Sequence, residues 1–238
     1  MKTLLLIAFC FFSTITFAQS NTNKKIIYRP IFELKTEVAR AGTAFLLVEN
    51  NNIFIVSAQH LVGTAGGLSK DYTGKEMAAQ FEAIKLEPLD SRFGSLTAKD
   101  LLSIPNAKAI EGDNFTDDIF IAPVSAQVDS EPFKLSGYRP SIDDKVFLFA
   151  QVNNQTASYH PAVVISSEEY ELAYLFENKT INLRATSGAP VLNSNYEVVG
   201  INLAGGEVPE VGVVGWANPL NSIKKHISNP KPLASHEE

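Results

Sequence analysis

The chain has 238 residues, of which 45% are hydrophobic and 19% are charged, and its formal net charge is −6. The acidic residues are scattered and no stripe of Lys and Arg is present, so the sequence shows no footprint for nucleic acid. Its one cysteine, Cys10, lies near the start. Folding therefore has to rest on apolar burial and not on disulfides, and the chain is long enough to bury such a core.

The first residues predict a cleavable signal peptide. A basic start at Lys2 precedes an apolar run from Leu4 to Phe17, and small residues lead to an exit at Ala18. The run is shorter than the roughly 20 apolar residues of a membrane span, and no second one follows, so we expect no membrane span. Residues 1–18 are the predicted signal peptide, and the mature protein is expected to be soluble and exported, either periplasmic or secreted. Its Lys and Arg then number 19 against 26 acids, a net charge of −7.

From Tyr28 onward, short apolar runs alternate with polar turns, which predicts an all-β fold. Two runs, Leu96 to Ile104 and Asn221 to Ile227, are predicted to be helices, the second with Asn221 as its N-cap. Residues 125–141 are predicted to link an N-terminal barrel, about 28–125, to a C-terminal barrel, about 140–220, and residues 229–238 are predicted to be a loose tail. The predicted strands are Gly42 to Val48, Ile53 to Ala58, Phe81 to Leu86, Asp118 to Val124, Val146 to Val152, Ala162 to Ile165, Leu172 to Phe176, Val198 to Leu203 and Val211 to Ala217.

Three short motifs at strand ends carry residues with catalytic chemistry. In chain order they are Ser57-Ala58-Gln59-His60, Asp117-Asp118-Ile119 and Thr186-Ser187-Gly188-Ala189-Pro190. Each alone has an ordinary explanation: a packed imidazole, a turn that opens a strand, and a tight turn.

Together these motifs resemble those of the trypsin-like serine protease family, which also has a Gly-Thr-Gly-Phe strand, here Gly42-Thr43-Ala44-Phe45. The resemblance covers residues 19–228 as one domain, with its motifs between about 40 and 227. The segments Asp144 to Ala150 and Gly215 to Asn221 look most like the protease unit of bacterial periplasmic heat-shock proteases, without their peptide-binding domain. The resemblance to the trypsin-like family implies two six-stranded antiparallel β-barrels of the chymotrypsin type and a short C-terminal helix.

The resemblance also implies a catalytic triad of His60, Asp118 and Ser187. A serine hydroxyl is a weak nucleophile, so an imidazole has to accept its proton and return it to the leaving group. A buried carboxylate on the far imidazole nitrogen fixes the tautomer and stabilises the imidazolium. The family's Asp directly precedes the Ile of its strand, which favours Asp118 and leaves Asp117 as the reserve candidate.

By the same resemblance, the backbone N–H groups of Ala185 and Ser187 form the oxyanion hole. The family has Gly where this chain has Ala44, Ala185 and Ala189. Alanine keeps its N–H, but a positive φ at this position would add roughly 1–2 kcal/mol of strain. These departures put activity in question more than the fold.

Substrate binding is expected along the strand Asn202-Leu203-Ala204-Gly205, where an extended peptide would add as an edge strand. Gly205 and Gly215 would keep the adjoining pocket open. Ile181 stands where the family often sets pocket chemistry, and its apolar side chain favours an uncharged substrate residue.

Thr186 carries no charge, and Gln19, the expected mature start, begins no Ile-Val-Gly-Gly sequence. Activation through a new N-terminus is therefore not expected, and the enzyme would assemble on folding or with an unknown activator or a second copy. His160, His226 and His236 lie far apart with no acid or cysteine at metal-ligand spacing, so we expect neither a metal nor another cofactor.

The leading hypothesis is a serine endopeptidase acting on exported or extracellular polypeptides through an acyl-enzyme. The first alternative is a catalytically silent or partner-activated binding module, because fold does not imply function. The second is ester hydrolysis at the same triad.

Overall fold

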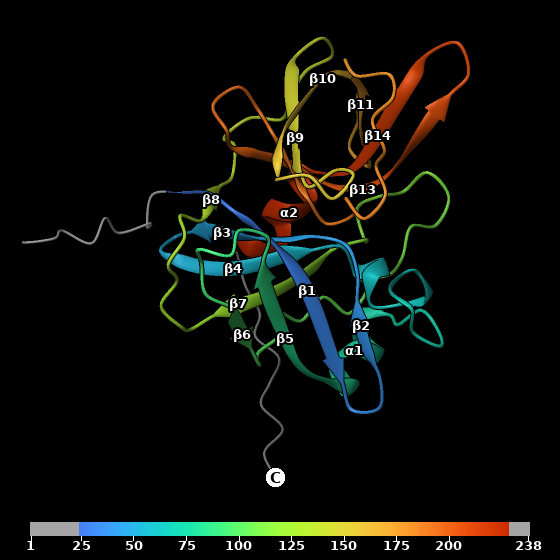
Figure 1. Cartoon of the computed structure of the whole chain (residues 1–238). Coiled ribbons are helices and arrows are strands. Elements are labelled where there is room, and N and C mark those ends of the chain that lie inside the picture. Colours follow the sequence, from blue (N-terminus) through green and yellow to red (C-terminus); the bar gives the residue numbers. More distant parts are fainter. Residues whose placement is uncertain (1–23, 229–238) are drawn as a thin grey trace, which may run out of the picture.

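The computed structural model describes residues 24–228, so the predicted signal peptide and tail lie outside the described residues. Figure 1 shows two β-rich halves, the blue and green strands of the first half below and the yellow and red strands of the second half above. No helix in the described range is long and apolar enough to cross a membrane.

The first half is an eight-stranded sheet. Six strands follow the order β6-β5-β1-β3-β4-β7, β2 pairs with β1, and β8 pairs in parallel with β3. No pairing between β6 and β7 closes this path. The strands are β1 (Ile27–Leu34), β2 (Val38–Arg40), β3 (Ala44–Glu49), β4 (Asn52–Ser57), β5 (Phe81–Pro88), β6 (Leu96–Ala98), β7 (Phe120–Val124) and β8 (Phe133–Lys134).

The second half is a closed six-stranded barrel in the order β10-β11-β14-β13-β12-β9. Helix α2 (Leu220–Ile227) follows it. The predicted all-β class, with a barrel and a short C-terminal helix, is confirmed. The barrel strands are β9 (Lys145–Ala150), β10 (Ser158–Ser167), β11 (Leu172–Phe176), β12 (Pro190–Leu192), β13 (Val198–Val208) and β14 (Gly212–Pro219).

Local sequence explains the tight turn between β3 and β4. Only Asn50 and Asn51 separate the two strands, and their φ angles are 49° and 63°. A two-residue hairpin turn of this kind needs positive φ at both positions, which asparagine tolerates better than most residues. The turn therefore sets the register that runs from Phe45 opposite Val56 to Glu49 opposite Asn52.

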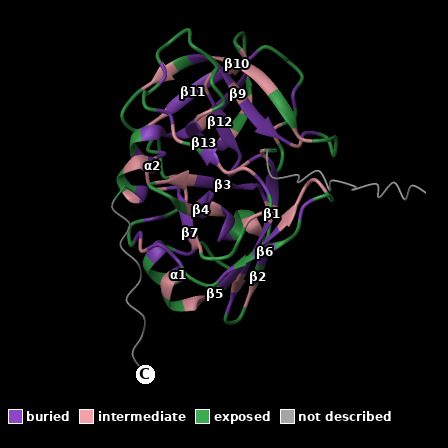
Figure 2. Cartoon of the chain, turned by 90° about the vertical axis from the view of Figure 1, so that its left-hand side faces the viewer, coloured by how far each residue is buried: buried purple, intermediate pink, exposed green. Residues whose placement is uncertain are grey.

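One hydrophobic core joins the two halves. Phe45 and Phe133 meet edge to face with their ring centroids 5.8 Å apart, and the same buried cluster takes in Ile201 from β13 and Ile223 from α2. A second cluster fills the closed barrel. In Figure 2 the buried residues, in purple, lie along strands of both halves. Helix α2 thus belongs to the core that lies between the halves.

The predicted helix over Leu96 to Ile104 is wrong. Leu96 and Ala98 are buried while Thr97 between them is exposed, and this alternation forms strand β6 against β5. The N-cap prediction at Asn221 is also wrong. Helix α2 begins one residue earlier, with Pro219 at the cap position and no side-chain cap.

Residues 125–141 do more than link the halves. They contain β8, and the hydroxyl of Tyr28 in β1 shares a 2.7 Å hydrogen bond with Ser130. Burial raises the pKa of Tyr28 to about 12, so this hydroxyl keeps its proton. The backbone N–H of Ser136 donates to the carbonyl of Val198 in the second half.

Candidate active site

His60 lies where β4 leaves the first sheet. The chain turns there into a 3₁₀ helix, Gln59–Leu61, and the flanking residues Gln59 and Leu61 are both buried. The Gln59 side chain donates to the carbonyl of Tyr72 at 2.8 Å. The buried residues on both sides fix the backbone at His60. Its imidazole lies at the surface of the cleft and is 13% exposed.

Asp118 holds His60 through both of its carboxylate oxygens. Oδ2 lies 2.6 Å from His60 Nδ1, and Oδ1 accepts the backbone N–H of His60 at 2.9 Å. The Asp118 side chain has no exposed surface. The structure thus brings Asp118, and not Asp117, against the imidazole. Because a carboxylate accepts from Nδ1–H, Nε2 is left free to take a proton.

The segment before β7 is fixed to the second half by Asn218 of β14. This fully buried side chain donates from Nδ2 to the carbonyls of Phe115 at 2.9 Å and Thr116 at 3.0 Å. The hydroxyl of Ser222 in α2 also donates to Thr116, at 2.5 Å. The position of Asp118 therefore depends on contacts from the opposite half, which sequence reasoning did not identify.

Ser187 lies in the tight loop before β12. Its carbonyl accepts the N–H of Thr43 at 2.8 Å, and the N–H of Gly188 donates to Asn202 at 2.7 Å. Gly188 has φ of +85°, and a Cβ there would lie 2.0 Å from the Thr43 carbonyl oxygen. Only glycine fits this position, so the Ser-Gly pair is required for the loop to sit between the halves.

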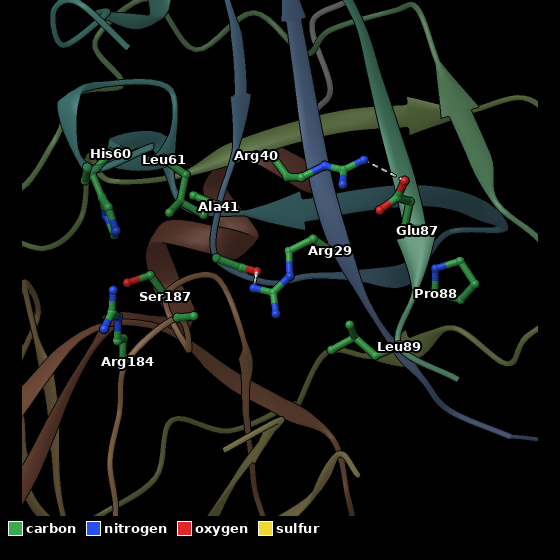
Figure 3. Close-up of a pocket in the computed structure, with 13 residues that line it drawn as sticks. Arg29, Arg40, Ala41, His60, Leu61, Glu87, Pro88, Leu89, Arg184 and Ser187 are labelled. Carbon is green, nitrogen blue, oxygen red and sulfur yellow. Dashed lines mark hydrogen bonds and ion pairs between the residues drawn. The ribbon is translucent and has the colours of Figure 1, made fainter. Parts of the chain in front are cut away.

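The Ser187 hydroxyl donates to the carbonyl of Leu203 at 3.0 Å. Among the hydrogen bonds of residues 24–228, none joins Ser187 to His60, although both side chains line the same cavity (Figure 3). Catalytic hydrogen bonds in ligand-free proteins are often long or poorly aligned and tighten when substrate binds. Rotation of the hydroxyl away from Leu203 would be the first step of any reaction here.

A buried polar network supports this loop from behind. Tyr174 Oη donates to Asn202 Oδ1 at 2.5 Å, Asn202 Nδ2 donates to Thr186 Oγ1 at 3.0 Å, and Thr186 Oγ1 donates to the Leu183 carbonyl at 2.7 Å. Tyr174, Asn202 and Thr186 are all 1% exposed or less. Burial raises the pKa of Tyr174, so its hydroxyl remains a donor. The loop is held by neutral hydrogen bonds and not by a charge pair.

Ala185 adopts the left-handed conformation, with φ of +64°. Its carbonyl accepts the Thr43 hydroxyl at 3.0 Å. Across the described part of the chain, no hydrogen bond uses the backbone N–H of Ala185 or Ser187. Both donors are therefore available to a bound group, and an oxyanion hole needs backbone donors of this kind. The positive φ of Ala185 carries the strain that the sequence analysis expected for an alanine in this conformation.

A pocket of about 610 Å³ lies on one side of Ser187. Four of the six predicted substrate-binding residues line it: Ile181, Asn202, Ala204 and Gly205. Leu203 lies outside it, with its side chain buried and its carbonyl bonded to Ser187. Gly215 also lies outside it, and a Cβ at this position would come within 2.6 Å of the Tyr174 ring.

A second cavity, of about 730 Å³, lies on the other side of Ser187 and includes His60. Figure 3 shows Arg29, Arg40 and Arg184 around it. Sequence reasoning missed all three. Arg184 stands three residues before Ser187, just outside the motif from Thr186 to Pro190. The two others belong to β1 and β2 and carry no local motif.

No family model and no curated protein matches the chain. Solved structures do match. The MamO protease domain from Magnetospirillum magneticum has a TM-score of 0.52 and 11% identity, covering 89% of this chain and 99% of that one. The active form of the Rv3671c protease from M. tuberculosis has a TM-score of 0.56 and 10% identity, covering 89% of this chain and 83% of that one.

A serine endoprotease from Yersinia pestis also matches, with a TM-score of 0.53 and 15% identity over 87% of this chain and 63% of that one. Identities this low compare folds and not activities. All three are proteases by name, and the similarity to them is one of fold. The chain has the fold of the trypsin-like serine proteases.

Proposed function

We propose that this protein is a serine endopeptidase that cleaves polypeptides through an acyl-enzyme, with Ser187 as nucleophile, His60 as general base and acid, and Asp118 as the orienting carboxylate. The observation that carries the proposal is the buried Asp118 carboxylate, which bonds both the ring and the backbone of His60 in a cleft shared with Ser187.

In the proposed reaction, Ser187 Oγ attacks the scissile carbonyl carbon and its proton passes to His60 Nε2. Asp118 stabilises the imidazolium from the Nδ1 side, and the N–H groups of Ala185 and Ser187 donate to the new oxyanion. The C–N bond then breaks, and Nε2 returns the proton to the departing amine. Water, deprotonated by His60, finally hydrolyses the ester and restores the serine.

The free edge of β13 supports a peptide substrate. Strand β12 pairs with β13 only over Val198 to Ile201, whereas β14 pairs with it as far as Val208. The backbone of Asn202 still bonds Gly188 and Ala189 of the serine loop, and beyond Asn202 the described residues leave this edge of β13 without a partner strand. An extended peptide can add there as a strand. Ile181, buried in the adjacent pocket, fits an uncharged side chain on the acyl side of the cleaved bond.

The division into a signal peptide at 1–18, a protease domain at 19–228 and a tail at 229–238 remains part of this proposal. So do export to the periplasm or the exterior and the absence of a cofactor. An unknown activator or self-association also stays a prediction.

A direct test is a search for newly formed N-termini by mass spectrometry after the protein is incubated with a denatured protein mixture. New termini that disappear with Ser187→Ala are expected. The Asp118→Asn variant should slow their formation by about 10⁴-fold, because it leaves the imidazole in the wrong tautomer. Termini that form equally with Ser187→Ala would come from a contaminant and would count against the proposal.

One observation favours a second candidate, a silent binding module of the same fold. The Ser187 hydroxyl bonds Leu203 instead of His60, and the oxyanion position is a strained alanine. In that case Ser187→Ala would bind polypeptide as well as the unchanged protein does, and neither would cleave it.

A further inference from the structure

The cavity that contains His60 and Ser187 is also lined by three arginines. Arg29 comes from β1, Arg40 from β2 and Arg184 from the loop before the serine. Glu87 is the one acid among the residues that line it. Figure 3 shows the Arg184 guanidinium beside Ser187 and the other two arginines on the opposite wall.

These charges are not balanced inside the protein. Arg40 Nη2 pairs with Glu87 at 2.8 Å, so those two cancel. Within residues 24–228, neither Arg29 nor Arg184 forms an ion pair. Arg29 is half-buried and donates only to neutral oxygens, at the Gly42 carbonyl (2.5 Å) and Gln151 (3.4 Å). Burial without an anion lowers its pKa.

Two uncompensated cations therefore face the cleft of a chain whose net charge is −6. A partly buried charge is costly unless it meets an opposite one, and none comes from the described residues. A guanidinium binds a carboxylate through two parallel N–H donors, which makes a carboxylate the best-matched anion on a peptide.

The geometry also says which part of a substrate enters this cavity. The cavity and the smaller pocket share three lining residues, Arg184, Ala185 and Ser187. His60 lines only the cavity, together with Arg29 and Arg40. In the proposed reaction His60 Nε2 protonates the departing amine, so the leaving segment has to lie on the side of His60. The acyl segment then lies along β13, in the other pocket.

We propose that this cavity binds a carboxylate on the leaving side of the substrate and that Arg184 and Arg29 determine that specificity. The carboxylate comes either from an acidic side chain within the first residues after the cleaved bond or from the end of the peptide itself. This inference rests on the proposed function, and it names the class of peptide that the same site takes.

Arg184 is the better residue to test. It is exposed, no hydrogen bond from its guanidinium is present in the described chain, and only its backbone N–H is engaged, with Asn182 at 3.0 Å. Replacement by glutamine removes the charge without opening the core. Arg139 provides a matched control, because it is also exposed and lines a different hollow with no residue in common.

The first experiment measures binding and does not depend on catalysis. Fluorescent peptide libraries, amidated at the C-terminus, carry either Glu or Gln at one fixed position and are titrated against Ser187→Ala. A third arm compares Gln libraries that end in a free acid or an amide. We expect the carboxylate form to bind about tenfold more tightly at one position, because a charge-assisted hydrogen bond typically changes affinity by about that factor. Adding Arg184→Gln should reduce that ratio to about twofold, whereas Arg139→Gln should leave it unchanged.

The second experiment measures kcat/KM of the unmodified enzyme on the matched peptides. The same preference should appear, and it should shrink as salt is raised, because the screening length falls from about 10 Å at 0.1 M to 3 Å at 1 M. The arm that shows the preference identifies the source of the carboxylate.

Equal binding of all matched pairs would overturn this inference, even if the enzyme cleaves peptides and the proposed function stands. A carboxylate preference that survives Arg184→Gln and Arg29→Gln together would overturn it as well. If the preference depends on Arg184 but nothing is cleaved, the proposed endopeptidase function fails and the carboxylate site remains.

Discussion

At the scale of single residues, Ala185 is the position where this chain departs most from an ideal site. Alanine in the left-handed region costs about 1–2 kcal/mol relative to its relaxed conformation. Glycine removes this strain but has more freedom to lose on folding. We expect Ala185→Gly to raise the free energy of unfolding by about 0.5–1 kcal/mol in chemical denaturation.

Ala189→Gly is the matched control, because Ala189 is fully buried and is not among the residues with positive φ. It should lower the free energy of unfolding by about 1 kcal/mol. If both variants shift stability in the same direction, the conformation assigned to Ala185 does not hold in solution.

The sequence showed where this strain could arise, but it could not show whether φ at Ala185 is positive. Gly-to-Ala departures are visible in a motif, and their cost follows from elementary sterics. Whether φ at Ala185 is positive depends on Thr43, 142 residues away, whose hydroxyl holds the Ala185 carbonyl. No local pattern contains that contact.

At the scale of elements, the loop between β11 and β12 depends on the Tyr174 hydroxyl. Replacing Tyr174 with Phe leaves Asn202 Oδ1 buried without a donor, a loss of about 1–3 kcal/mol. We expect this drop in urea unfolding, with the secondary structure unchanged in circular dichroism.

Tyr196→Phe serves as the comparison, because Tyr196 is 45% exposed and its hydroxyl makes no hydrogen bond to the described residues. Its stability should change by less than about 0.5 kcal/mol. Equal effects of the two substitutions would mean that the hydrogen-bond network behind the Ser187 loop contributes nothing to stability.

Element prediction succeeded where periodicity was strong and failed where signals were short. The strand before His60 was found because an apolar run, Ile53 to Ala58, ends there. Strand β12, which follows Ser187, was missed because it has only three residues. Helix α1 (Gly74–Gln80) was missed, although Thr73 and Glu76 form a complete capping box, a pattern visible in the sequence. A helix was wrongly predicted for Leu96 to Ile104 because the leucines of this segment suggest a helical face. The alternation around Thr97 is that of a strand.

At the scale of the whole molecule, the two halves share one core, and this predicts a single unfolding transition. Trp216, the only tryptophan, packs against the shared core. Its fluorescence and the far-ultraviolet circular dichroism should therefore change at one denaturant concentration. Two separated midpoints would show that the halves unfold independently.

A substitution in α2 sharpens this prediction. Ile223 is fully buried in the shared core, and Ile223→Ala should cost about 2–5 kcal/mol. Both probes should move to lower denaturant by the same amount. Movement of one probe alone would place Ile223 in the core of one half only.

Whole-molecule features were the least predictable from sequence. The proposed triad could be predicted because each member carries its own motif. The cationic cavity combines β1, β2 and the serine loop, which only the fold brings together. Asn218 lies within a motif that the sequence singled out, yet its link to the Asp118 segment spans about a hundred residues. Such long-range contacts need the three-dimensional arrangement.

The most direct test of the proposed triad is the intact mass of the purified protein after exposure to a fluorophosphonate. We predict one covalent adduct on the folded protein, absent from Ser187→Ala and strongly slowed in Asp118→Asn, because only an activated serine reacts at a useful rate. A well-folded protein with no adduct, or an adduct that persists in Ser187→Ala, would contradict an active Ser187–His60–Asp118 site.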